Sequence, residues 1–323
     1  MRLRQIIRQL AALSILVVYG LATALPASAQ SRPQERDAES PNGTPVLWQE
    51  PVDIASRDLF LGPGGEAMRP DLSSLTFLKE EKGGYSTKFR VRDGAGREWV
   101  VKVGKEAQSE TAAVRLLWAV GYYTEINYLA PRVTIPGKGT FENVRFEARP
   151  DYVKRLDEWK WKKNPFVWTK QLQGLIVMMA LLNNWDIKDT NNKILQVRSD
   201  RTGRNELRYI ISDLGATFGK VKLDVPGFWR IARTRNEPGD YRRSGFVEDV
   251  KNGQVYFFYK GKRQDLFDDI KIEEARWIGG WLARLSDRQI ADAFRAANYT
   301  QSEVRMLTRA VRERITELVR LTK

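Results

Sequence analysis

The chain has 323 residues, of which 42% are hydrophobic, and a formal net charge of +14 at pH 7. This length and hydrophobic content allow one large domain or two lobes, and the charge favours a phosphate-bearing or otherwise anionic partner without choosing between nucleotide, anionic lipid and nucleic acid. The sequence contains neither Cys nor His, which excludes disulfides, thiolate catalysis, Ser-His-Asp hydrolysis and His-ligated zinc.

Residues 1–29 have the pattern of a secretory signal peptide. Three arginines within the first eight residues precede an almost wholly apolar run over residues 10–25, and residues 27–29 (Ala-Ser-Ala) offer a small-x-small cleavage site. We therefore expect an exported protein, periplasmic or extracellular, with an uncleaved membrane anchor as the alternative. Residues 30–51 are polar and rich in Pro, Ser, Glu and Gly, which predicts a flexible linker.

The next region, residues 52–150, is predicted to form a small β-rich lobe. Three β-like runs over residues 75–79, 85–92 and 98–103 are separated by Gly-containing turns. The apolar spacing over residues 108–120 then predicts a helix. Two further β-like runs, around residues 133–135 and 144–148, lead towards a connection between lobes.

The segment Asp151–Asn164 interleaves lysines and an arginine with Tyr152, Trp159 and Trp161. Such a mixture suits an anionic membrane surface or single-stranded nucleic acid. A solvated helix face with snorkelling side chains is the more common outcome, and we do not expect nucleic acid to be the partner.

Residues 151–323 are predicted to form a larger, mainly helical lobe. Residues 168–183 are apolar over much of a helical circumference, so this helix should be buried. A hairpin follows over residues 193–211, and a second is centred on residues 251–253. A helix is expected over residues 273–283, and capping-box patterns starting at Ser286 and Thr300 open two more.

Chemistry-bearing residues gather around the first of these hairpins. Asp186 and Asn191 stand five residues apart with Lys188 between them, and Asp213-Leu214-Gly215 follows the hairpin. The hairpin should bring Asn191 and Asp213 to the same edge. Phosphoryl transfer depends on positioning and on charge neutralisation by metal ions, and carboxylate and amide oxygens suit such ions. The layout therefore indicates a phosphoryl-transfer site.

Asp186-x-Lys188-x-x-Asn191 resembles the catalytic loop of the protein-kinase superfamily, and Asp213-Leu214-Gly215 resembles its metal-binding Asp-Phe-Gly. The resemblance is to an atypical branch that includes phosphatidylinositol kinases, bacterial toxin kinases and secretory-pathway kinases. It implies an α+β fold of two lobes. It also implies a kinase that moves the γ-phosphate of a nucleoside triphosphate, such as ATP, to a hydroxyl acceptor with Mg²⁺ or Mn²⁺.

The resemblance also implies roles for individual residues. Asp186 would orient and deprotonate the acceptor hydroxyl, Lys188 would neutralise charge on the transferring group, and Asn191 and Asp213 would hold the metal. Asn192 is a spare amide that could replace Asn191. Lys102, in the third β-like run, would contact the α- and β-phosphates.

In this family a glutamate on the following helix pairs with the strand lysine. Glu110 matches that position for Lys102, and Glu106 is the competing choice. The family's Gly-x-Gly-x-x-Gly loop is missing; Gly83, Gly84 and Lys88 lie in its place and could cradle phosphates.

Substrate identity does not carry over from the family. The segment 215–220 after Asp213 is a candidate activation segment or substrate-facing loop, but no Ala-Pro-Glu closes it. The acceptor therefore stays unknown. A catalytically inactive kinase-like protein, serving as a ligand-binding module or scaffold outside the cytoplasm, is the alternative to an active enzyme.

Overall fold

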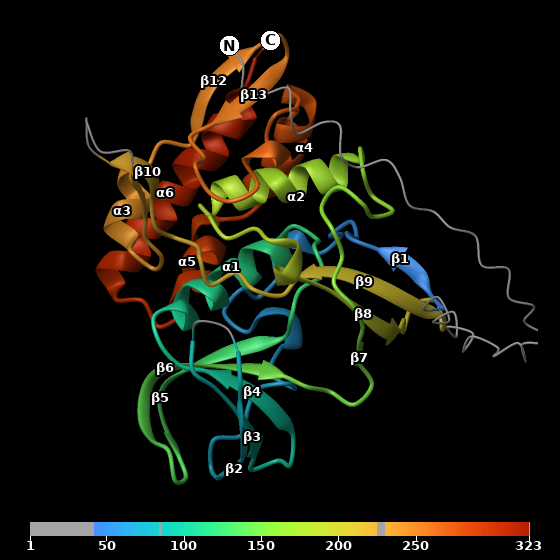
Figure 1. Ribbon diagram of the computed structural model, residues 1–323, viewed down its shortest axis with the longest axis vertical. Helices are drawn as coiled ribbons and strands as arrows, with labels where there is room; N and C mark the ends of the chain where they lie inside the picture. The colour runs from blue at the N-terminus through green and yellow to red at the C-terminus, as the bar shows by residue number, and fades with distance from the viewer. Residues whose placement is uncertain (1–41, 84–85, 225–229, 323) are drawn as a thin grey trace, which may run out of the picture. The chain divides into compact units, whose positions relative to one another are not determined.

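The computed structural model describes residues 42–83, 86–224 and 230–322, with backbone alone between residues 221 and 232. The predicted signal peptide and most of the predicted linker lie outside the described residues. The described part contains a five-stranded sheet with one helix against it and a larger, mainly helical region (Figure 1).

The five-stranded sheet is antiparallel throughout and has the order β2-β3-β4-β6-β5. The strands are β2 Leu75–Glu81, β3 Lys88–Asp93, β4 Glu98–Lys102, β5 Asn127–Ile135 and β6 Gly139–Ala148. The three predicted β-like runs are thus confirmed as β2, β3 and β4, and the two later runs are the ends of the longer strands β5 and β6. Alternate residues of β3 point inward, so that Phe89 and Val91 join a core that includes Trp99 and Phe146.

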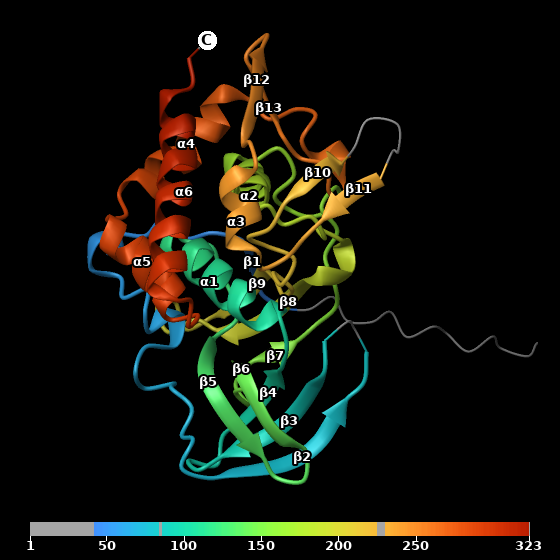
Figure 2. The ribbon, with the colours of Figure 1, turned by 90° about the vertical axis from the view of Figure 1, so that its left-hand side faces the viewer.

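Helix α1, Glu106–Ala119, is the predicted helix after β4. Nearly all of its residues are buried, because it packs against β5 and β6 on one side and against α5 on another. Figure 2 shows α1 lying between the five-stranded sheet and the helices of the larger lobe. The side chains that α1 carries can therefore reach groups from both lobes.

A second sheet has the order β1-β9-β8-β7, with β1 Thr44–Val46, β7 Lys154–Arg155, β8 Asn192–Arg198 and β9 Asn205–Ile211. β8 and β9 are the predicted hairpin. β1 pairs in parallel with β9, and Leu47 after it is 2% exposed. The predicted linker over residues 30–51 therefore does not extend to residue 51, because β1 covers the otherwise open edge of β9.

The remaining elements form the mainly helical lobe. They are α2 Lys170–Leu181, β10 Val221–Asp224, β11 Arg230–Arg233, α3 Pro238–Arg243, β12 Val247–Lys251, β13 Gln254–Phe257, α4 Ile272–Ala283, α5 Asp287–Arg295 and α6 Gln301–Arg320, with 3₁₀ turns at Ile54–Ser56, Gly62–Gly64, Asp189–Asn191 and Gln264–Leu266. The capping boxes predicted at Ser286 and Thr300 open α5 and α6. The buried face of α6 packs against α3, α4 and α5.

The segment Asp151–Asn164 is not a helix. It contains β7 and turns, and its two tryptophans, Trp159 and Trp161, are 3% and 2% exposed. The Trp159 indole N–H donates to the Ile210 carbonyl at 2.9 Å, and the two rings contact each other edge to face. Tertiary packing has taken these aromatic rings into the core, so they are not available to a membrane surface.

The observed architecture is α+β and two-lobed, as predicted. Within the described residues, no helix is both long and apolar enough to span a membrane.

Candidate active site

A cavity of about 530 Å³ collects most of the predicted site residues. Those that line it are Lys88, Lys102, Glu110, Asp186, Lys188, Asn191 and Asp213. They come from strands β3 and β4, helix α1, the loop after α2 and the end of β9. Residues far apart in the sequence and from both lobes thus meet around one space.

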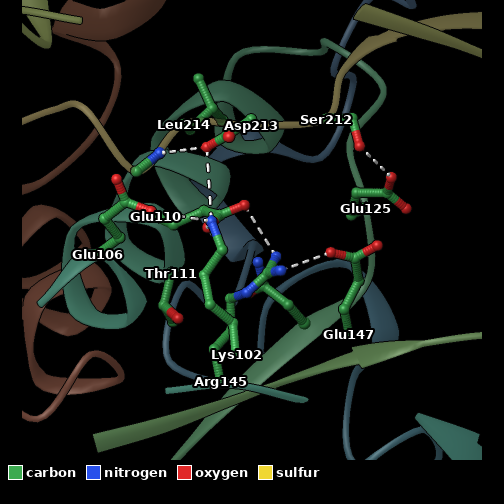
Figure 3. A network of polar contacts seen from close by, with 12 residues as sticks. Lys102, Glu106, Glu110, Thr111, Glu125, Arg145, Glu147, Ser212, Asp213 and Leu214 are labelled. Carbon is green, nitrogen blue, oxygen red and sulfur yellow. Dashed lines mark hydrogen bonds and ion pairs between the residues drawn. The ribbon is translucent and has the colours of Figure 1, made fainter. Parts of the chain in front are cut away.

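Lys102 is buried at the end of β4 and forms ion pairs with residues of both lobes. Its Nζ lies 2.7 Å from Glu110 Oε2, 3.4 Å from Glu106 Oε2 and 3.5 Å from Asp213 Oδ1 (Figure 3). Burial alone would lower the pKa of Lys102, but the carboxylates of Glu110 and Asp213 outweigh burial and raise this pKa above its ordinary value. Lys102 is therefore cationic at all physiological pH values. The closer partner is Glu110, with Glu106 as a second.

Three cations form a row across adjacent strands of the small-lobe sheet. Lys88 on β3 is the register partner of Lys102 on β4, which is in turn the partner of Arg145 on β6. All three side chains line the cavity. Like charges on directly opposite positions destabilise a sheet, and here Glu110 lies 2.9 Å from Arg145 as well as contacting Lys102. The carboxylates thus offset part of the positive charge of the row, and the cationic groups that remain suit the phosphates of a nucleotide.

Asp213 follows β9, and its side chain is 41% exposed towards the cavity. Burial of the carboxyl opposes ionisation, but Lys102 and the Gly215 N–H, which donates to Asp213 Oδ1 at 3.1 Å, hold the pKa of Asp213 below its usual range. A Cβ on Gly215 would lie 2.8 Å from the Cβ of Glu106. The glycine is thus required by the close approach of helix α1.

The predicted meeting of Asn191 with the segment before Asp213 is confirmed. Asn192 and Ile211 are register partners at the ends of β8 and β9, and the Ser212 N–H donates to the Asn191 carbonyl at 2.7 Å. The Asn191 side-chain amide donates to the Asp186 carbonyl at 2.6 Å.

Helix α2 positions Asp186. The helix starts at Thr169, whose hydroxyl accepts from the Leu172 N–H, and it ends before Asn183, which has φ of 51°. Asparagine tolerates this left-handed conformation, and the chain turns there into the loop that carries Asp186. The Asn183 side-chain amide donates to the Gly219 carbonyl at 2.9 Å, and this bond anchors the start of the loop.

Both carboxylate oxygens of Asp186 are ion-paired to lysines. Lys188 Nζ lies 3.0 Å from Oδ2, and Lys262 Nζ lies 2.6 Å from Oδ1. Lys262 comes from the loop after β13, and it also lines the cavity. No local pattern in the sequence marks Lys262, because the loop reaches Asp186 through tertiary contacts such as the Lys262 N–H donating to the Trp185 carbonyl at 2.8 Å.

Arg145 and Glu147 were missed as well, although a signal for them exists. Both are charged residues inside a strand whose neighbours Val144 and Phe146 are fully buried. The same argument that selected Lys102 in β4 selects them in β6. Their side chains form an ion pair at 2.7 Å, and both line the cavity.

Other predicted residues lie elsewhere. Asn192 is 1% exposed and its side-chain amide donates to the Trp159 carbonyl at 3.0 Å, so Asn191 and not Asn192 faces the cavity. Gly83 is exposed and is not among the residues that line the cavity, and Gly84 lies outside the described residues. From this loop Ser86, together with Lys88, reaches the cavity.

The segment 215–220 was predicted to be an activation segment or a substrate-facing loop. Residues 214–219 are buried, and the Phe218 ring packs edge to face on Tyr241 and Phe294. The start of this segment is therefore part of the core, and it does not face a substrate.

The site offers two protein ligands for a divalent cation. In the described part of the chain no cluster of three or more Asp, Glu, His or Cys side chains could hold a metal by itself. Asn191 and Asp213 nevertheless supply the amide and carboxylate oxygens that Mg²⁺ prefers, and this ion is commonly bound by one or two protein groups together with substrate phosphates and water. The residues present therefore fit a nucleotide-bound metal.

Comparison with known proteins gives similarity at the level of structure. No protein-family model and no curated protein sequence matches this chain. A crystal structure of the Helicobacter pylori proinflammatory kinase CtkA is similar, with 13% identity, a TM-score of 0.47, and 79% of this chain and 99% of that chain covered. The Rio2 kinase of Chaetomium thermophilum, in its ADP/Mg²⁺-phosphoaspartate complex, has 16% identity and a TM-score of 0.32 over 78% of this chain and 74% of that chain.

The described elements follow the order that the resemblance to the protein-kinase fold implies. A small antiparallel lobe carries the buried lysine, one helix carries its glutamate partner, and the larger lobe carries the Asp-x-Lys-x-x-Asn loop, the hairpin and the Asp-x-Gly turn in that order.

Proposed function

We propose that this chain is a metal-dependent phosphotransferase that moves the γ-phosphate of a nucleoside triphosphate, such as ATP, to a hydroxyl-bearing acceptor. One observation carries the proposal: the Nζ of Lys102 lies 2.7 Å from Glu110 and 3.5 Å from Asp213. A phosphate-binding cation of the small lobe is thereby held next to the candidate metal ligand of the large lobe. Productive phosphoryl transfer requires this alignment.

The phosphate chain would lie against Lys88 and Lys102. Both line the cavity, and their charges are directed to one space by the β3–β4 register. Asn191 and Asp213 would hold Mg²⁺ or Mn²⁺. When bound, the metal would neutralise charge on the phosphate oxygens.

Asp186 would accept the proton of the acceptor hydroxyl. Lys188 and Lys262 each pair with one of its carboxylate oxygens, and each oxygen has a second lone pair that could accept from the incoming hydroxyl. Both lysines line the cavity, where their charges would offset the charge that develops in the transition state.

Export forms part of the proposal. Its basis is the basic, apolar and small-residue pattern of residues 1–29, with an uncleaved anchor as the alternative. The acceptor is a hydroxyl compound that is reached outside the cytoplasm, and an anionic membrane surface is one place where such a basic protein would find it.

A catalytically inactive ligand-binding protein is the second candidate. The observation that favours it is that Lys188 and Lys262 each pair with one Asp186 oxygen, so that a substrate hydroxyl would share this carboxylate with two ammonium groups. The two candidates differ in turnover, and the inactive protein would bind a nucleotide or another ligand, or serve as a scaffold.

The test is calorimetric titration of ATP into the full-length protein, with Mg²⁺, with Mn²⁺ and without metal. We expect metal-dependent binding in the wild type, its loss in Asp213→Ala, and its retention in the control Asp249→Ala, whose carboxylate lies on β12 away from the cavity. Asp186→Asn should keep binding and lose turnover by at least about 100-fold.

Binding without turnover in the wild type, under either metal, would favour the inactive candidate. Absence of metal-dependent ATP binding in the wild type would reject the phosphotransferase and leave an inactive scaffold or a protein for another ligand, and full turnover by Asp186→Asn would reject the assignment of the base.

A further inference from the structure

A second cavity, of about 520 Å³, lies behind the connection between the two lobes. It is lined by residues of the α1–β5 loop, of the segment 148–155 and of the β8–β9 hairpin. Among the described residues, Arg149 is the one that lines both this cavity and the candidate active site. We call it the rear cavity. Its volume falls in the range typical of sites for small organic molecules, about 300–1,000 Å³.

One wall of the rear cavity is apolar. Leu195, Val197 and Ile210 of the hairpin are buried and form a small hydrophobic cluster of their own, against which Val153 and Tyr123 pack. All five line the cavity. This wall is separate from the two larger cores, so it provides apolar surface that a ligand can cover.

The other walls carry arginines, each of which is ion-paired to a carboxylate. Four guanidinium groups, those of Arg57, Arg149, Arg155 and Arg208, line the cavity, against the carboxylates of Glu125 and Asp151. A guanidinium has five N–H donors, and the contacts of these arginines with protein acceptors use two or three donors each. The cavity therefore has more donors than acceptors.

Aromatic rings hold two of the arginines in place. The guanidinium of Arg57 lies over the Trp118 ring at 4.8 Å, and that of Arg208 lies over the Tyr123 ring at 4.7 Å. Stacking on a ring fixes the plane of a guanidinium. Arg57 also contacts Asp53 and the Trp118 carbonyl, and Arg208 contacts Glu206, so the remaining N–H groups of each are the donors left for an anion. Thr124, another lining residue, has a buried hydroxyl with no hydrogen-bond partner among the described residues.

We propose that the rear cavity is a binding site for a small organic anion that has a flat apolar body. The apolar body would cover the wall formed by the β8–β9 hairpin, and the anionic group would accept hydrogen bonds from the arginines. The orphaned Thr124 hydroxyl supplies a further polar contact. Among the described residues this site shares Arg149 with the candidate active site, and its other lining residues are different.

A continuous set of polar contacts joins the rear cavity to the candidate active site. Arg155 Nη1 lies 2.8 Å from Glu125 Oε1, and the Ser212 hydroxyl, next to Asp213 in the chain, donates to the same oxygen at 3.1 Å. Figure 3 shows Ser212 and Glu125 together with the candidate nucleotide-binding residues.

A second branch runs through Arg149, which forms an ion pair with Glu147. Glu147 pairs with Arg145 at 2.7 Å, and Arg145 pairs with Glu110 at 2.9 Å. Glu110 is the partner of Lys102. An anion that engages Arg149 or Arg155 competes with Glu147 or Glu125, and so it shifts the balance of charge around Lys102 and Asp213.

Reciprocal coupling to nucleotide binding follows, and this coupling rests on the proposed function. If the anion changes the affinity for ATP and metal by a given factor, ATP and metal must change the affinity for the anion by the same factor.

The test titrates the fluorescent probe anilinonaphthalene sulfonate, which has flat rings and one sulfonate, into the full-length protein. We expect saturable binding at one site. Phenyl phosphate should displace the probe, and benzyl alcohol at the same concentration should not, because it lacks the anionic group.

Two variants locate the site. Arg155→Met removes the cation next to Glu125, and its folding is checked by circular dichroism because Glu125 is buried. Arg57→Met is the milder change, since its partner Asp53 is 55% exposed. We expect each to weaken probe binding at least tenfold, whereas Arg198→Met, an exposed arginine at the end of β8 that does not line the cavity, should bind as the wild type does.

Equal probe affinity in the wild type, Arg57→Met and Arg155→Met would overturn the proposal, as would displacement by benzyl alcohol as effective as that by phenyl phosphate. If Arg155→Met does not fold, the probe affinity of Arg57→Met decides whether the proposal stands. Because these readouts need no nucleotide, an absence of ATP binding would reject the proposed function and leave the rear cavity to be judged by the probe alone.

Discussion

Replacing Lys102 by Met tests whether the charged centre of the site also stabilises the fold. The substitution keeps most of the side-chain volume and removes the cation that faces Glu110, Glu106 and Asp213 at 2.7, 3.4 and 3.5 Å. Removing one partner of a buried ion pair costs about 3–5 kcal/mol, since the other charge stays buried without compensation. Arg145 still lies 2.9 Å from Glu110, so we expect a loss near the lower end, about 3 kcal/mol.

The loss should depend on pH with a definite sign. Burial raises the pKa of Glu110, while Arg145 and Lys102 oppose this rise. Without Lys102 the pKa of Glu110 rises further above its unfolded value, so the folded variant takes up a proton on Glu110 as the pH falls. The destabilisation should therefore be larger at pH 8 than at pH 5.

The assay is urea unfolding of the full-length protein, followed by fluorescence at pH 5 and pH 8. Lys79→Met is the matched control: this lysine is 59% exposed and lies 3.4 Å from Glu81, so its loss should change the stability by less than about 1 kcal/mol. A loss in Lys102→Met no larger than that in Lys79→Met, or a loss independent of pH, would show that Lys102 is not the compensating charge of a buried cluster.

Three further predictions follow from the same region. Gly215→Ala should cost about 1–3 kcal/mol in urea unfolding, because the added Cβ would lie 2.8 Å from Glu106 Cβ. The control Gly280→Ala, at an exposed position in α4 with open space around it, should be neutral or stabilising. Equal losses of stability in the two variants would contradict the clash. Since the pKa of Asp213 is lowered in the folded state, the stability difference between wild type and Asp213→Asn should be complete near pH 7 and shrink below about pH 4; a constant difference from pH 7 to pH 3.5 would refute this. Lys262→Met should lower kcat at least about tenfold in a phosphate-transfer assay, with the KM for ATP within about threefold; an unchanged kcat would remove Lys262 from the reaction.

Local pattern predicted most elements because the interactions that form them are local. Alternation and Gly-containing turns located β2, β3 and β4, and capping boxes located the starts of α5 and α6. Lys102 in β4 could also be identified from local sequence, because a charge inside an apolar strand requires a partner. The structure of the segment Asp151–Asn164 could not be predicted in this way, since nothing in its local sequence shows that Trp159 and Trp161 enter the core.

The sequence by itself determined the residues that can do phosphoryl-transfer chemistry, the order in which they occur and the hairpin that brings Asn191 next to Ser212. The tertiary structure decided which of them meet. Lys262 reaches Asp186 from a loop 76 residues further along the chain, and the row from Lys88 to Arg145 exists because β6 pairs with β4. Ion pairs of this kind form between segments with no sequence relation, because packing and strand register set their distances.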